Sequence, residues 1–65
     1  MRTFQYNELD KEGNPVTITI TDIDILRDYF PWWSEEMRRI GRPDQINEDD
    51  CIEDFIFAHW AWEIK

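Results

Sequence analysis

The sequence predicts a small α+β fold: a three-stranded antiparallel sheet with a long kinked helix and a short helix on one face, in the order β-β-α-α-β. Three patterns predict it. Residues 16–21 alternate apolar and threonine side chains, residues 23–40 repeat apolar residues every three or four positions, and residues 55–64 are rich in strand-forming types. At 65 residues, the chain is expected to form one acidic domain, residues 1–65.

Two strands are expected at the start of the chain. Residues 3–8 alternate polar and apolar, with Phe4 and Tyr6 on one side. Turn-forming residues at 10–15 separate this segment from residues 16–21, so the two strands should pair as an antiparallel hairpin. In the second strand, the apolar residues should face the core and the threonines the solvent. These apolar residues are Val16, Ile18 and Ile20.

The main helix is predicted from its start signal and its apolar stripe. Thr21 and Asp24 have the spacing of a capping box, with Asp in place of Glu. The stripe ends before Gly41, a residue type that commonly follows a helix. Because Pro31 falls on the side away from the stripe, we expect a kinked helix or two short helices that meet there. The stripe consists of Ile23, Leu26, Phe30, Trp33, Met37 and Ile40.

The last third of the chain combines acids with aromatics. After a loop at 42–44, Asn47 can cap a short helix that runs to about Asp54, with acids in its first turn, where the helix dipole favours them. Residues 55–64 are interpreted as a third strand that contains His59 and lies beside the N-terminal strand, in the centre of the sheet. A helix through Trp62 is the main alternative, since short apolar runs are ambiguous.

Composition limits the classes of function. The formal net charge is −8, yet the chain has four Trp, four Phe and two Tyr, which a disordered acidic tail would lack. An acidic coat repels nucleic acid and anionic membranes and attracts basic surfaces. No apolar run could span a bilayer, no leader is evident, and Cys51 has no partner for a disulfide. We therefore expect a cytoplasmic protein that binds neither membranes nor nucleic acid directly.

Two sets of acids are candidate binding residues. At 100° per residue, Asp24, Asp28 and Glu35 fall within about 40° of each other, opposite the apolar stripe; we call them the carboxylate ridge. Each set alone is consistent with an ordinary solvated helix face. Together, rows of carboxylates can imitate backbone phosphates, because a groove of Lys and Arg binds nucleic acid mainly through charge. The second set, the acidic cluster, consists of Glu48, Asp49, Asp50, Glu53 and Asp54.

Other side chains carry weaker signals. Trp32 lies off the stripe beside Ile25 and Tyr29, so it is either part of a second buried face or an exposed anchor of the kind found at interface hot spots. We expect His59 to be structural and Cys51 to be a half-buried packing thiol. No zinc spacing, calcium loop, glycine-rich phosphate loop or catalytic arrangement is evident, so no enzyme activity, metal or cofactor is expected.

The chain also resembles a known class of proteins in its overall pattern. The resemblance is carried by DYFPWWSEEM at 28–37, GRPDQI at 41–46 and the acidic-then-aromatic segment 48–63. Together these resemble small phage and mobile-element proteins, and specifically type I-C anti-CRISPR inhibitors, over roughly residues 16–64. No catalytic or ligand motif anchors the resemblance, so it transfers no site residues.

The resemblance implies a stoichiometric inhibitor of the acidic DNA-mimic class, acting in the bacterial host cytosol. Such an inhibitor would bind the basic DNA-recognition surface of a type I CRISPR surveillance complex and block target DNA binding, which begins with recognition of a short duplex motif. The alternative is a generic acidic protein–protein interaction module that binds through an aromatic face around Tyr29 and Trp32. A small metal-dependent enzyme is a third possibility and would require a retained metal ion.

Overall fold

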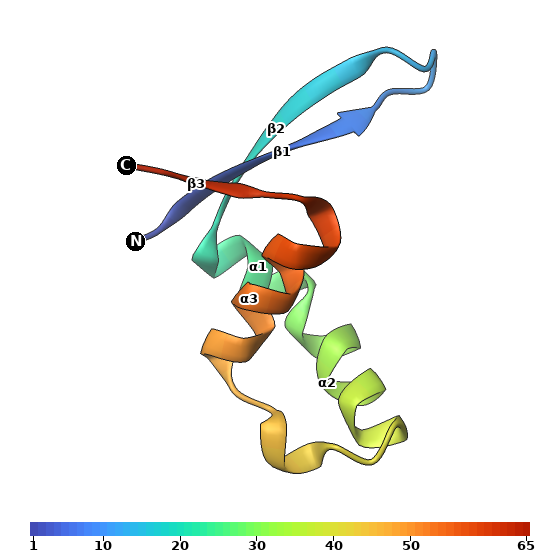
Figure 1. Cartoon of the computed structure of the whole chain (residues 1–65), viewed down its shortest axis with the longest axis vertical. Helices are drawn as coiled ribbons and strands as arrows, with labels where there is room; N and C mark the ends of the chain where they lie inside the picture. The colour runs from blue at the N-terminus through green and yellow to red at the C-terminus, as the bar shows by residue number, and fades with distance from the viewer.

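The computed structural model describes all 65 residues, with a three-stranded antiparallel sheet at one end and three α-helices gathered beneath it (Figure 1). The predicted small α+β class is therefore confirmed. In chain order the elements are β1 (Thr3–Leu9), β2 (Pro15–Thr21), α1 (Asp22–Asp28), α2 (Phe30–Arg39), the 3-10 helix η1 (Pro43–Gln45), α3 (Glu48–His59) and β3 (Trp62–Ile64).

The sheet has the order β2-β1-β3. β1 and β2 pair along their whole lengths, and Asp10 shapes the turn between them by accepting hydrogen bonds from the amides of Glu12 and Asn14, both at 2.9 Å. β3 pairs only with Thr3–Gln5 at the start of β1. The C-terminal strand thus lies beside the N-terminal one, as predicted, but its central placement is wrong. β1 is central because β2 already occupies one of its edges and the short β3 takes the other.

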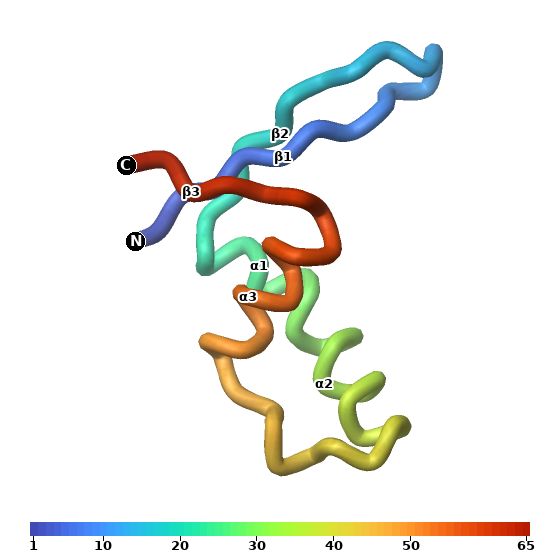
Figure 2. Tube along the Cα trace, in the orientation of Figure 1, coloured from blue at the N-terminus to red at the C-terminus, as the bar shows by residue number.

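The far end of the hairpin extends beyond the helices (Figure 2). Phe4, near the helices, is fully buried, whereas Ile18 and Ile20 are only half-buried. Val16, opposite Glu8 toward the tip, is exposed, so the prediction that it faces the core is wrong. Alternation correctly assigned the strand, but no helix reaches far enough to cover its outer part.

The predicted break in the main helix is confirmed. Thr21 caps α1 through a reciprocal capping box with Asp24. α1 ends at Asp28 and α2 begins at Phe30, with Pro31 in its first turn, where the missing N–H has no intrahelical partner to lose. The two helices meet at Tyr29.

Burial along α1 and α2 differs from the predicted stripe at both of its ends. The predicted stripe included Ile23 and Ile40, but both are exposed, whereas Ile25 is fully buried. Ile23 lies in the first turn of α1 and Ile40 lies just after α2, so both ends of the predicted stripe extend beyond the part that the core covers. Trp33 is buried, and Leu26, Phe30 and Met37 are half-buried, so the middle of the stripe is confirmed.

The strand predicted for residues 55–64 is wrong over most of its length. α3 continues to His59, and only Trp62–Ile64 is a strand. Asn47 caps α3 as predicted, with its side-chain oxygen accepting the amide of Asp50 at 2.8 Å. The apolar run fits both periods, and the helix is favoured because it buries one side, formed by Cys51, Ile52 and Phe55. The alternative of a helix through Trp62 was closer to the structure.

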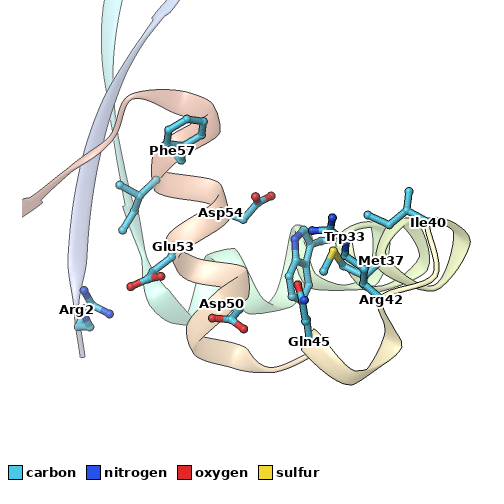
Figure 3. Close-up of a pocket in the computed structure, with 11 residues that line it drawn as sticks. Arg2, Trp33, Met37, Ile40, Arg42, Gln45, Asp50, Glu53, Asp54 and Phe57 are labelled. Carbon is cyan, nitrogen blue, oxygen red and sulfur yellow. The ribbon is translucent and has the colours of Figure 1, made fainter.

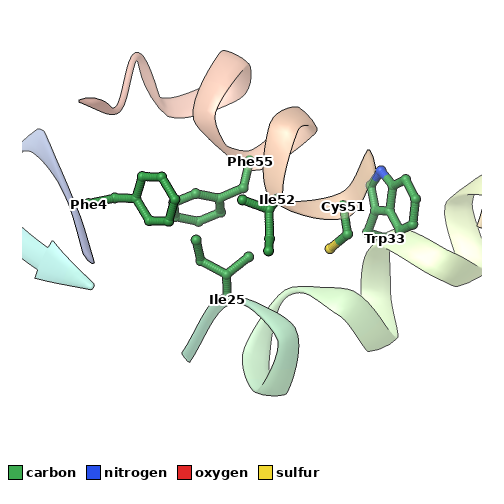
Figure 4. Packing of buried hydrophobic residues seen from close by; sticks show 6 residues of the cluster. All are labelled: Phe4, Ile25, Trp33, Cys51, Ile52 and Phe55. Atoms are coloured by element: carbon green, nitrogen blue, oxygen red, sulfur yellow. The ribbon is translucent and has the colours of Figure 1, made fainter. Parts of the chain in front are cut away.

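The core joins the sheet to all three α-helices (Figure 4). Phe4 of β1 and Ile25 of α1 lie against α3, and Trp33 of α2 lies near its first turn. Tyr29 and Tyr6 add edge-to-face contacts to Phe55, with ring centroids 5.2 and 5.6 Å apart. One side of α3 is therefore fixed in the core, and the opposite side is left to the solvent. The core consists of Phe4, Ile25, Trp33, Cys51, Ile52 and Phe55.

Candidate functional site: the outer face of α3

The outer face of α3 divides into an acidic half and an aromatic half. At 100° per residue, the side opposite the buried residues carries Asp49, Asp50 and Glu53 in the first two turns and Phe57 toward the end. Phe57 is 84% exposed, and Trp60, which ends the helix, is 88% exposed. Both large aromatic side chains therefore face water directly beyond the carboxylates.

The acidic cluster forms no ion pairs. The structure contains four ion pairs, and none of them involves Glu48, Asp49, Asp50, Glu53 or Asp54. One cation influences the cluster at longer range: Glu63 and, to a smaller extent, the charge of Asp49 raise the pKa of Arg2. Two members have neutral hydrogen-bond donors instead: Asn47 donates to Asp50 at 2.8 Å, and the Tyr29 hydroxyl donates to Asp54 at 3.1 Å. These neutral partners orient the carboxylates without cancelling their charge.

The density of this charge is comparable to that of duplex DNA. With a rise of about 1.5 Å per residue, residues 48–54 span about 9 Å of the helix axis. The five carboxylates therefore give about one charge per 2 Å, against about 1.7 Å for both strands of a duplex. A basic surface that binds DNA through charge would thus meet a similar local field at α3.

Tyr29 links the acidic cluster to α1 and α2. Its ring packs on Phe55, and its hydroxyl reaches Asp54. Burial, and then the nearby Asp54 carboxylate, raise the pKa of Tyr29 to about 12. The phenol is therefore protonated even at moderately alkaline pH, and its hydroxyl donates a hydrogen bond to the cluster.

The carboxylate ridge is arranged differently. Arg27 forms ion pairs with both Asp24 and Asp28, at 3.1 and 3.0 Å. Hydrogen bonds from the Thr21 amide and hydroxyl, with a smaller effect of Arg27, lower the pKa of Asp24. A hydrogen bond from Arg27 lowers the pKa of Asp28. Glu35 is exposed on α2 and has no ion pair, so it is the one ridge acid without a cation.

Trp32 is exposed rather than part of a second buried face. It retains 58% of its accessible surface, and its ring lies 5.4 Å from that of Tyr29. Ile25, which was placed beside it on the helical wheel, is instead fully buried. Trp32 therefore extends an aromatic surface from Tyr29 outward on the α2 side.

A groove of about 810 Å³ runs between α2 and α3 (Figure 3). Asp50, Glu53 and Asp54 line it from α3, and Met37 of α2 and Ile40 just after α2 line the other side. Arg2 and Arg42 also line this groove. The acidic cluster is thus next to apolar surface, an arrangement suited to contacts that combine charge with burial of apolar atoms.

Sequence reasoning did not identify Phe57 and Trp60 as candidate site residues. The strand interpretation assigned them to opposite faces of a sheet and treated both as partly covered. A helical projection continued from the Asn47 cap would have placed Phe57 beyond Glu53 on the outer face. The signal that could have identified Phe57 was therefore the helical period that starts at Asn47. The residue types alone favoured a strand.

Cys51 and His59 have structural environments. Cys51 is fully buried, and burial, followed by the charge of Asp54, raises the pKa of its thiol to about 11. His59 stacks on Phe55 at 4.0 Å, and its Nδ1 lies 3.0 Å from the Phe55 carbonyl oxygen. The two residues are eight positions apart on α3, about 12 Å along its axis. Cys51 was predicted to be half-buried, and its complete burial exceeds that expectation.

No three His, Cys, Asp or Glu side chains come together in a way that could hold a metal ion. None of the helices is both long and apolar enough to cross a membrane.

Comparison with protein-family models, curated proteins and solved structures found no match to this chain. The resemblance to anti-CRISPR inhibitors consequently remains a prediction from the sequence pattern.

Proposed function

We propose that this protein is a stoichiometric, non-catalytic inhibitor that imitates the backbone charge of DNA. Its acidic cluster on α3 would occupy the basic DNA-recognition surface of another protein and block the binding of target DNA. Following the sequence resemblance, the proposed partner is the target-recognition subunit of a type I CRISPR surveillance complex, and the proposed place of action is the bacterial host cytosol.

The observation that carries this proposal is the acidic cluster on α3, which is free of ion pairs. Asp49, Asp50 and Glu53 lie on the side of α3 opposite the core, and none of the five cluster carboxylates pairs with a lysine or arginine. A partner would therefore not need to break ion pairs before it binds them. Its Lys and Arg side chains would be attracted to these carboxylates by charge, as they are to the phosphates of DNA, and salt would screen this attraction.

The proposal is tested by charge reversal in the acidic cluster. Asp49→Lys/Glu53→Lys changes the net charge from −8 to −4, because each reversal adds two units. The matched control, Glu8→Lys/Glu12→Lys, makes the same change near the hairpin tip. Binding of duplex target DNA by a purified type I-C surveillance complex is measured by mobility shift with each inhibitor variant present.

We expect the wild type and the hairpin control to prevent the DNA shift, and the α3 variant to lose this effect while keeping its helical circular dichroism. Inhibition should also weaken as salt rises from about 50 to about 200 mM. If the α3 variant inhibits as well as the wild type, the proposed function is wrong.

The second candidate function is an acidic interaction module that binds through an aromatic face. It is favoured by the exposure of Trp32 over Tyr29, since exposed aromatic residues often anchor interfaces. For this function, Trp32→Ala should weaken partner binding more than the α3 reversal does, and salt should have little effect.

A further inference from the structure

α2 and α3 end with the same backbone conformation and the same hydrogen bond, but the residue at the left-handed position differs between them. After α2, Gly41 has a φ of 82°, and the amide of Arg42 donates to the Met37 carbonyl at 2.8 Å. After α3, Trp60 has a φ of 55°, and the amide of Ala61 donates to the Ile56 carbonyl at 3.0 Å. Glycine is the usual residue at such a position, because a Cβ makes the left-handed conformation unfavourable.

In the folded chain, Trp60 gains little packing that could offset the cost of its left-handed backbone conformation. Its side chain is 88% exposed, so it contributes little packing to the core. It is also the only residue other than glycine with a positive φ. A large aromatic residue at a position that glycine fits better, and facing water, indicates a role outside the folding of the monomer.

Trp60 forms an apolar hollow of about 270 Å³ with Ile56 and Phe57, and only these three residues line it. We call it the aromatic clasp. Glu53 lies one turn before Ile56 and Phe57 on the same side of α3, and its carboxylate has no ion-pair partner. The clasp therefore combines an aliphatic side chain, two exposed aromatic rings and a nearby free negative charge.

We propose that the aromatic clasp binds an arginine side chain on the partner's basic surface, an inference that rests on the proposed function and specifies one contact within it. The aliphatic stem of the arginine covers Ile56, and its planar guanidinium group stacks on the indole of Trp60. Its N–H groups point toward the carboxylate of Glu53. Each part of the clasp thus matches one part of the arginine side chain.

Arginine fits this site better than other occupants. A lysine ammonium group is compact and strongly hydrated, so it gains less from stacking on a flat ring. A nucleic-acid base could stack on Trp60, but its phosphates would meet the acids of the preceding turns. A second copy of the chain would bring another net charge of −8 to the same surface.

The test compares an arginine-rich peptide with a lysine-rich peptide of otherwise identical sequence. The full-length protein is titrated with each peptide at low salt, and binding is followed by NMR of the backbone amides and the tryptophan indole N–H groups. The test variant, Trp60→Gly, removes the ring and places glycine at the left-handed position, so the fold should be retained. Trp32→Ala removes the other strongly exposed indole and is the matched control.

For the wild type, we expect the arginine-rich peptide to bind about fivefold more tightly than the lysine-rich peptide and to shift the Trp60 indole signal. Trp60→Gly should remove this preference, and Trp32→Ala should keep it. Equal affinities in the wild type, a preference that survives Trp60→Gly, or no binding of the arginine-rich peptide would overturn the proposal.

Two further outcomes would replace it with another occupant. A single-stranded oligonucleotide that shifts the Trp60 signal would indicate base stacking, and sedimentation as a dimer that Trp60→Gly abolishes would indicate self-association. The peptide titration tests only the arginine preference of the clasp. The proposed function is tested separately, by DNA competition with Asp49→Lys/Glu53→Lys, so either one can fail without the other.

Discussion

The carboxylate ridge on α1 and α2 and the acidic cluster on α3 look equivalent in the sequence, but they differ in how their charge is held. In the ridge, one guanidinium group, that of Arg27, forms ion pairs with both Asp24 and Asp28 and offsets one of their two negative charges. In the cluster, side-chain hydrogen bonds come only from neutral groups, and none of the five carboxylates forms an ion pair. Local composition therefore does not measure the charge available to a partner, because a single well-placed arginine can cancel much of it.

The largest expected effect comes from reversing two charges in each region. Asp49→Lys/Glu53→Lys should weaken binding of the partner by about a hundredfold, or about 2.7 kcal/mol, since two charges without ion pairs become repulsive. Asp28→Lys/Glu35→Lys makes the same change in net charge on the ridge and should stay within about fivefold of the wild type. Affinities from calorimetry would check both values. Equal losses would mean that the ion pairs of Arg27 do not distinguish the two regions.

A smaller effect concerns stability at the ends of the two helices. Trp60→Gly should stabilise the protein by about 1 kcal/mol, because glycine adopts the left-handed conformation without steric cost. Gly41→Ala should destabilise it by about the same amount, although the added Cβ would have no heavy atom within 4 Å. Urea unfolding followed by circular dichroism measures both. If Trp60→Gly destabilises the protein, Trp60 has a packing role in the monomer and the comparison with Gly41 is wrong.

The smallest effect concerns the hydrogen bond that joins the two regions. Tyr29→Phe removes the donor to Asp54 and should cost about 0.5 kcal/mol of unfolding free energy, because the bond is exposed to solvent. Tyr6→Phe is the matched control, since the Tyr6 hydroxyl donates no hydrogen bond, and it should have a smaller effect.

The environment of Tyr29, mainly its burial and then the nearby Asp54 carboxylate, predicts a pH dependence. The folded pKa of Tyr29, about 12, lies above the ordinary value of about 10, so the unfolded chain releases its proton first as pH rises. The stabilisation is complete below about pH 10 and is lost between about pH 10 and 12. Thermal melting across this range should show a steeper loss in the wild type than in Tyr29→Phe.

Much of the fold could be predicted because its signals are local. The alternation of residues 16–21, the capping box of Thr21 and Asp24, and the cap at Asn47 each depend on residues within a few positions of one another. The last ten residues could not be assigned in this way. Their apolar side chains satisfy both a helical and a strand period, and burial of Phe55 against Tyr6 and Tyr29 depends on distant parts of the chain.

The candidate site was only partly accessible to sequence reasoning for the same reason. The acids of the cluster were found because five of them fall within seven consecutive residues. Phe57 and Trp60 were missed because their exposure follows from α3 continuing to His59. For Trp32, the sequence allowed either a buried or an exposed side chain. Which of the two occurs depends on how α1 and α2 meet at Tyr29.

By itself, the sequence determined the strong negative charge, the hairpin, the helix caps and the positions of both acidic regions along the chain. The tertiary structure decided which carboxylates keep their charge free and which aromatic rings remain in water. The physical reason is that charge and periodicity are properties of neighbouring residues, whereas ion pairing and burial depend on which elements meet in space. On α3, one side is fixed in the core, so the other must present acids and aromatics together.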